Sequence, residues 1–124
     1  SSILSSAPTG GGIGYATGAG GAVTQITSRS TGVTLSKLSG AITTDATSLA
    51  AGDEAVFTVT NTTVAVGDTV VVCARSGQTA GTSVPIVTTV AAGSFDITLT
   101  NLHASTEDTG AMIINFAVIK AVGA

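Results

Sequence analysis

The sequence predicts an all-β fold, an antiparallel, jelly-roll-like β-sandwich of about eight strands. From residue 22 onward, Val, Ile, Thr and Phe alternate with small or polar residues in short segments. Turn-forming clusters of Gly, Asp and Ala separate these segments at intervals of about 8–12 residues, a spacing typical of a sandwich or barrel. No segment longer than one turn shows the 3.6-residue period of an amphipathic helix.

Eight segments are expected to form strands, and each is bounded by turn residues. In chain order they span residues 22–27, 32–37, 40–44, 55–60, 69–75, 83–90, 94–102 and 111–122. The segment that begins at residue 94 places Phe95, Ile97 and Leu99 on one face and polar residues on the other, as a half-buried strand does. Residues 45–51 (DATSLAA) could form one helical turn capped by Asp45. Turns are expected at residues 51–53, 66–68, 91–93 and 108–110.

The first 21 residues are predicted to form a Gly-rich extended arm, separate from the sandwich domain of residues 22–124. Glycine loses more backbone entropy on ordering than any other residue, so this segment cannot fold alone. Its sizeable apolar residues are isolated along it: Ile3, Leu4, Ile13 and Tyr15. We expect these four to anchor the arm on a partner surface; a disordered tail is the alternative.

The composition excludes several classes of function. The 124 residues carry a net charge of −3, which is the wrong sign for binding nucleic acid through its phosphates. A single Cys cannot form an internal disulfide, and no apolar run reaches the ~18 residues of a membrane span. Charged residues make up only 9% of the chain, against about 25% in an ordinary soluble domain. Either Thr, Ser and Gly cover the surface, or other copies of the chain bury part of it.

The last strand is apolar on both faces, and this favours a subunit interface. Alternate residues fall into two sets, one with Met112 and one with Ile113. One face would pack in the core, and the other needs cover from a neighbouring subunit or from a loop. The segment 69–73 has the same doubly apolar pattern. The candidate residues of a trimer interface are Met112, Ile113, Ile114, Phe116, Val118 and Ile119.

The sequence predicts no catalytic, cofactor or metal site. A glycine-rich phosphate-binding loop lies between a strand and a helix, and the sequence predicts neither a strand before the glycine-rich arm nor a helix after it. His103, Glu107 and Asp108 could approach a metal, but we expect a solvated loop because a site needs three or four converging ligands. Cys73 lies in an apolar strand and is expected to be buried. The sequon at Asn61 has meaning only in a protein secreted by a eukaryote.

Several short motifs in a fixed order resemble a known family. Residues 18–25 read GAGGAVTQ, residues 28–37 read SRSTGVTLSK and residues 40–43 read GAIT. In the C-terminal half, VVV at 70–72 is followed by glycines at 77 and 81, by VAAGSF at 90–95 and by IINFAVIK at 113–120. This series resembles a segment common in small structural proteins of tailed bacteriophages.

The resemblance implies a non-enzymatic virion protein of the capsid decoration (cement) or head-fibre type. Such a protein would form a homotrimer through a jelly-roll-like domain and bind the major capsid protein on the outer surface of the head. It would be assembled in the bacterial cytoplasm and would need neither membrane nor nucleic acid. The alternative is a head- or tail-fibre module that acts as a receptor- or glycan-binding tip.

Overall fold

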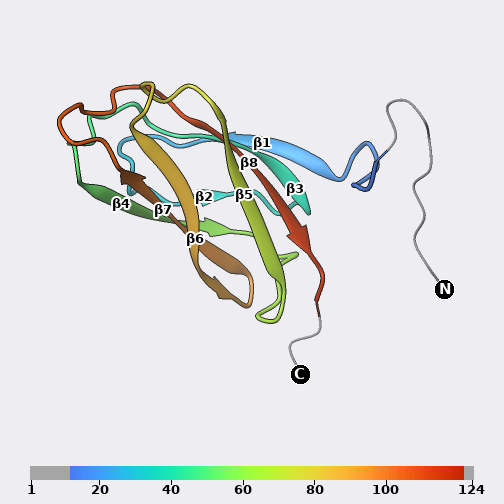
Figure 1. The fold of residues 1–124 in the computed structure, drawn as a ribbon. Helices are drawn as coiled ribbons and strands as arrows, with labels where there is room; N and C mark the ends of the chain where they lie inside the picture. Colours follow the sequence, from blue (N-terminus) through green and yellow to red (C-terminus); the bar gives the residue numbers. More distant parts are fainter. Residues whose placement is uncertain (1–11, 122–124) are drawn as a thin grey trace.

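The computed structural model describes residues 12–121, which form two four-stranded β-sheets and no helix (Figure 1). One sheet, sheet A, has the strand order β1-β3-β8-β5, and the other, sheet B, has the order β2-β4-β7-β6. The strands are β1 (Gly20–Thr24), β2 (Val33–Thr34), β3 (Ser39–Thr43), β4 (Glu54–Thr60), β5 (Thr69–Ser76), β6 (Ser83–Ala91), β7 (Ser94–Asn101) and β8 (Ile113–Ile119). Each lies within or beside a segment that the sequence predicts to be a strand, so the all-β prediction is confirmed.

Both sheets are mixed, and the prediction of a purely antiparallel sandwich is therefore wrong. β1 pairs with β3 in parallel, and β2 pairs with β4 in parallel, whereas the other strand pairs are antiparallel. The reason is that the first four strands alternate between the sheets, so that β1 and β3 meet as neighbours after β2 has crossed to sheet B. A jelly roll contains antiparallel strands, and the two parallel pairs depart from that arrangement.

The parallel pairing of β1 and β3 depends on two facing glycines. Gly21 lies opposite Gly40 in the register. A Cβ atom on Gly40 would lie 2.7 Å from the Gly21 carbonyl oxygen and 2.8 Å from a methyl carbon of Leu35. Only glycine leaves room there for both the neighbouring backbone and the Leu35 side chain.

The hydrophobic core lies between the two sheets. Sheet A contributes Ile42, Ile114, Phe116 and Val118, and sheet B contributes Phe57, Val59, Phe95, Ile97 and Leu99. The Phe95 and Phe116 rings meet across the sandwich with their centroids 5.5 Å apart. At about 1.5–3 kcal/mol for each large buried apolar side chain, this layer is the main source of stability.

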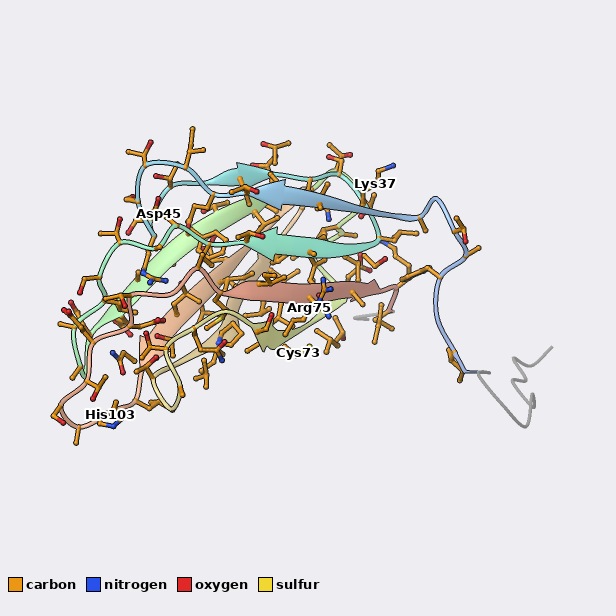
Figure 2. The ribbon with its side chains drawn as sticks, turned by 90° about the horizontal axis from the view of Figure 1, so that it is seen from above. Lys37, Asp45, Cys73, Arg75 and His103 are labelled. Carbon is orange, nitrogen blue, oxygen red and sulfur yellow. The ribbon has the colours of Figure 1, made fainter. Side chains whose placement is uncertain are left out.

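Different loops lie at the two ends of the sandwich, which are called here the near end and the far end. The near end has the N-terminal segment 12–19 and the loops 35–38, 61–68 and 92–93, together with residues 120–121. The far end has the loops 25–32, 44–53, 77–82 and 102–112. Figure 2 shows Lys37 at the near end, and Asp45 and His103 toward the far end.

Three local predictions change. β1 begins at Gly20, inside the segment assigned to the arm, because Gly20 and Gly21 pair with β3. Residues 45–51 form no helical turn; the Asp45 carboxylate accepts a hydrogen bond from the Thr47 N–H, and Leu49 instead bridges to Asp108. The expected strand 32–37 is reduced to β2, two residues long.

Candidate functional site

The outer face of sheet A is a surface of apolar and small polar residues that crosses all four strands, with the exposed Arg75 toward the far end of β5. In register, Ala22, Ala41, Asn115 and Cys73 form one row. The adjacent row is Gly20, Ser39, Ala117 and Val71. Ile113 and Ile119 lie toward the two ends of β8 on the same face. No charged residue lies in either row, so another protein can cover these two rows without desolvating a charge. Arg75 lies beyond them, toward the far end of β5.

The structure divides the six predicted interface residues between the core and this face. Four of the six are buried between the sheets: Met112, Ile114, Phe116 and Val118. Their side chains are committed to the core and cannot reach a neighbouring subunit. The other two of the six, Ile113, which is half-buried, and Ile119, which is exposed, point outward from β8.

The N-terminal segment lies against the near end of this face. The Tyr15 hydroxyl donates a hydrogen bond to the Val118 carbonyl. A cavity of about 430 Å³ separates the segment from β8, and it is lined by Ile13, Gly14, Tyr15, Ala117, Ile119 and Lys120. Ile13 and Tyr15 remain exposed, whereas Ile3 and Leu4, the other two predicted anchors, lie outside the described residues.

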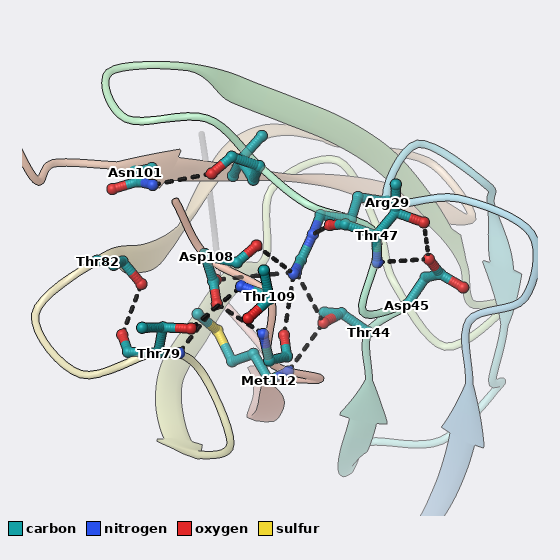
Figure 3. Close-up of polar contacts among 12 residues, drawn as sticks. Arg29, Thr44, Asp45, Thr47, Thr79, Thr82, Asn101, Asp108, Thr109 and Met112 are labelled. Carbon is teal, nitrogen blue, oxygen red and sulfur yellow. Dashed lines mark hydrogen bonds and ion pairs between the residues drawn. The ribbon is translucent and has the colours of Figure 1, made fainter. Parts of the chain in front are cut away.

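A buried arginine organises the far end, and the sequence analysis missed it. Arg29 donates to the carbonyl oxygens of Thr47, Asp108 and Gly110 and to the Thr44 hydroxyl (Figure 3). Its Nη1 also lies 3.9 Å from Asp108 Oδ2. One side chain thus ties together three loops that are distant in sequence.

Asp108 is fully buried, contrary to the expectation that it belongs to a solvated loop. Burial raises the pKa of its carboxyl, but hydrogen bonds from the Thr79 and Gly110 N–H groups, together with the Arg29 charge, outweigh this and lower the pKa. Thr79 and Gly110 donate to Asp108 Oδ1 at 2.9 and 3.0 Å. The carboxylate is therefore a structural anion that holds the 77–82 and 102–112 loops together.

A second ion pair closes the near end. The Lys120 ammonium donates to Asp68 Oδ2 and, at 2.9 Å, to the Thr63 carbonyl. The Lys120 hydrogen bond lowers the pKa of Asp68, and the Ala65 N–H at 2.8 Å reinforces it. The pair fastens the end of β8 to the 61–68 loop.

The remaining candidate residues form no reactive centre. His103 accepts hydrogen bonds at Nδ1 from the Ser105 and Thr106 N–H groups, and no group of three metal-ligating side chains occurs within residues 12–121. Cys73 is exposed, because the outward side of an edge strand in sheet A has no covering layer. Asn61 is buried and donates to the Lys37 carbonyl at 2.7 Å, so a glycosylating enzyme could not reach it in the folded chain.

Several residues of the recognised motifs have structural partners. Gln25 is buried, donates to the Thr31 carbonyl at 2.8 Å and accepts from the Asp45 N–H at 3.0 Å. Arg29 forms the far-end cluster, and Gly21 and Gly40 permit the β1–β3 pairing. The signal that could have identified Arg29 is that a lone arginine occurs among Ser and Thr in a chain with four basic residues.

No helix among the described residues is long and apolar enough to cross a membrane. Comparisons with protein-family models, with curated proteins and with solved structures found no match.

Proposed function

We propose that this protein is a non-enzymatic structural protein of a phage virion. In this proposal it forms a homotrimer that binds the major capsid protein on the outer surface of the head and stabilises the shell. A ligand that binds only the assembled shell stabilises it by RT ln(1 + [L]/Kd) at each site, and the effect is multiplied over many sites. The proposal includes the expectation that this sandwich is related to the jelly-roll-like domains of such proteins.

The observation that carries the proposal is the largely apolar outer face of sheet A, whose two central rows contain no charged residue. Ile113, Ala117 and Ile119 of β8 lie beside Val71 and the exposed Cys73 of β5. A protein with 9% charged residues that exposes such a face to water has poor solubility. Contact between copies of the chain would remove this apolar surface from water. The order of the motifs, which resembles that of phage structural proteins, supports the assignment to a virion.

A receptor- or glycan-binding fibre tip is the second candidate. Sugar sites usually present exposed aromatic rings that stack on the sugar. The chain has one Tyr, three Phe and no Trp, and Phe57, Phe95 and Phe116 are all buried in the core. This scarcity of exposed rings favours the decoration role.

Two measurements test the proposal. The number of copies in purified virions distinguishes the roles, because hundreds indicate decoration and a few indicate a fibre. Light scattering at micromolar concentration should give about three times the chain mass of 11.9 kDa. A monomer mass would contradict the trimer.

A matched pair of variants locates the contact. Ile119→Glu places a charge on the outer face of sheet A, and Ile86→Glu places one on the outer face of sheet B; the two isoleucines are 51% and 50% exposed. An unpaired charge in a buried interface costs about 3–5 kcal/mol, so only Ile119→Glu should dissociate the trimer. The Cys73 thiol should then react faster with a thiol reagent, because it lies on the same face.

The arm is part of the same proposal. Deleting residues 1–14 should leave the melting temperature of the trimer nearly unchanged and should greatly weaken binding to heads, because the anchors carry most of the contact. Tyr15, with its hydrogen bond to Val118, stays in the truncated chain. If the truncated trimer binds heads as tightly as the full chain, the arm is not the docking element.

A further inference from the structure

The two edges of sheet B are protected against pairing with another strand. An edge strand presents unpaired backbone N–H and C=O groups, and natural proteins protect it by short length, proline, bulges or charge. In sheet B the edge strand β2 has only two residues. The other edge strand, β6, contains Pro85, and its register with β7 shifts after Val87.

The two edges of sheet A lack this protection over most of their length. From Thr69 to Ala74, β5 pairs with β8 in unbroken register, and its sequence there, TVVVCA, contains no proline, glycine or charged residue. The register shift and Arg75 come only at its far end. The opposite edge strand, β1, pairs with β3 over five residues without a shift. Among the described strands, each of the two pairs on one side only.

The two free edges of sheet A run in the same direction. β1 is parallel to β3, and both β3 and β5 are antiparallel to β8, so β5 runs parallel to β1. A rotation about an axis parallel to the strands changes neither the direction of a strand nor its position along the axis. Three copies related by such an axis therefore place β5 of one copy alongside β1 of the next, in parallel. The rows of the outer face then continue from one copy to the next.

We infer that in the trimer β5 of each copy pairs in parallel with β1 of the next copy. The three A sheets then close into one ring of strands around the threefold axis, with their outer faces turned inward, and no edge of sheet A stays open. The occupant of each free edge is a second copy of this chain. This inference rests on the proposed function, in which the chain forms a trimer through this face.

The width of sheet A fits such a ring. Four strands spaced by about 4.8 Å make a side about 19 Å wide, and the middle of each side of such a triangle lies about 5.5 Å from the axis, close to half of the ~10 Å at which facing sheets pack. The two central strands, β3 and β8, come closest to the axis and need small side chains there. In the two central rows they present Ser39, Ala41 and Ala117, together with Asn115.

The same axis gathers the three near ends at one end of the trimer. The N-terminal segment lies at the near end, so the three segments leave the trimer side by side (Figure 1). Each segment approaches its own outer face at Ala117 and Ile119. The row that contains Ala22 and Cys73 lies nearer to the far end than the row of Ala117, beyond the residues that line this contact.

The single cysteine of the chain provides half of a cross-link that tests the pairing. Cys73 and Ala22 lie in one row on the two opposite edge strands, about 14 Å apart within one chain, and a disulfide needs Cα atoms about 4.4–6.8 Å apart. In the ring, Ala22 of the next copy lies about 4.8 Å from Cys73. Mild oxidation of Ala22→Cys should therefore link the chains into covalent trimers on a non-reducing gel.

Two matched variants control for chance collisions. Thr24→Cys lies on the same strand and face, one row farther along, and Ile86→Cys is exposed on the outer face of sheet B. Each should give at least tenfold less covalent trimer than Ala22→Cys. Thermal melting and light scattering of every reduced variant check that fold and trimer are retained.

Hydrogen exchange of the unmodified chain measures the edge directly. The amides of β5 should exchange at least tenfold more slowly in the wild-type trimer than in dissociated Ile119→Glu, because those that point away from β8 gain a partner. The amides of β6 should exchange equally in both, since the inference leaves that edge open.

The outcomes separate this inference from the proposed function. A trimer in which Ala22→Cys links no better than its controls, or in which β5 gains no protection, would overturn the inference and leave the proposed function intact. Wild-type dimers linked through Cys73 would show that β5 pairs with β5 of a second copy, and would also overturn it. A trimer that links as expected but binds no head would support the inference and refute the proposed role on the shell.

Discussion

Replacing Arg29 with Met removes the guanidinium that joins three loops at the far end of the sandwich. The substitution keeps much of the side-chain volume but deletes every N–H donor. The carbonyl oxygens of Asp108 and Gly110 lose hydrogen bonds of 3.2 and 3.0 Å, and the Thr47 carbonyl loses its bond to Nε. Because Arg29 is buried, water does not replace these donors freely.

The expected loss of unfolding free energy is about 3 kcal/mol. Removing one partner of a buried ion pair costs about 3–5 kcal/mol, because the other charge stays buried. The lower end applies here, since the closest approach of Arg29 Nη1 to the Asp108 carboxylate is long, at 3.9 Å, and Asp108 Oδ1 keeps its bonds from Thr79 and Gly110. For a domain of this size, a loss of this magnitude lowers the melting temperature by about 10–15 °C.

Urea unfolding followed by circular dichroism measures this loss, with Arg75→Met as the control. Arg75 is exposed on β5, so its substitution should change stability by less than about 0.5 kcal/mol. A double-mutant cycle with Asp108→Asn should give a coupling of about 0.5–3 kcal/mol. A loss below 1 kcal/mol for Arg29→Met, or no coupling, would refute the view that this cluster holds the far end.

The remaining predictions concern pH, packing and a buried amide. The pKa values of Asp108 and Asp68 in the folded chain lie below their usual 3.8, so the unfolded chain binds more protons than the folded chain in acid. Urea unfolding should therefore show full stability above about pH 4 and a decline in stability as the pH falls below it. The decline should be less steep for Asp108→Asn than for the wild type. Gly40→Ala should lower stability by about 1–3 kcal/mol, because the new Cβ meets backbone at 2.7 Å, whereas Gly14→Ala enters open space and should melt like the wild type. Asn61→Ala should cost about 1–3 kcal/mol in the same assay, since it removes a buried amide that donates to the Lys37 carbonyl and accepts from the Thr63 N–H.

The sequence determined the strands because their pattern is local. Period-2 alternation and turn residues located all eight strands, and the seventh, with Phe95, Ile97 and Leu99 buried, has the predicted faces. The alternation in the last strand likewise separated the buried set of Ile114 and Phe116 from the outward set of Ile113 and Ile119. It could not say which set faces the core, since both are apolar.

Only the tertiary structure decided how the strands pair and which polar residues are buried. The parallel β1–β3 pair depends on β2 crossing to the other sheet and on the contact of Gly21 with Gly40, and neither is visible in the alternation of one strand. Arg29 and Asp108 are 79 residues apart and look like ordinary loop residues, yet they meet in a buried cluster. Hydrophobic periodicity indicates the two faces of a strand because successive side chains point to opposite faces, which is a local property of the chain. Strand pairing and the burial of polar groups depend instead on contacts between residues that are distant in sequence and meet only when the chain folds.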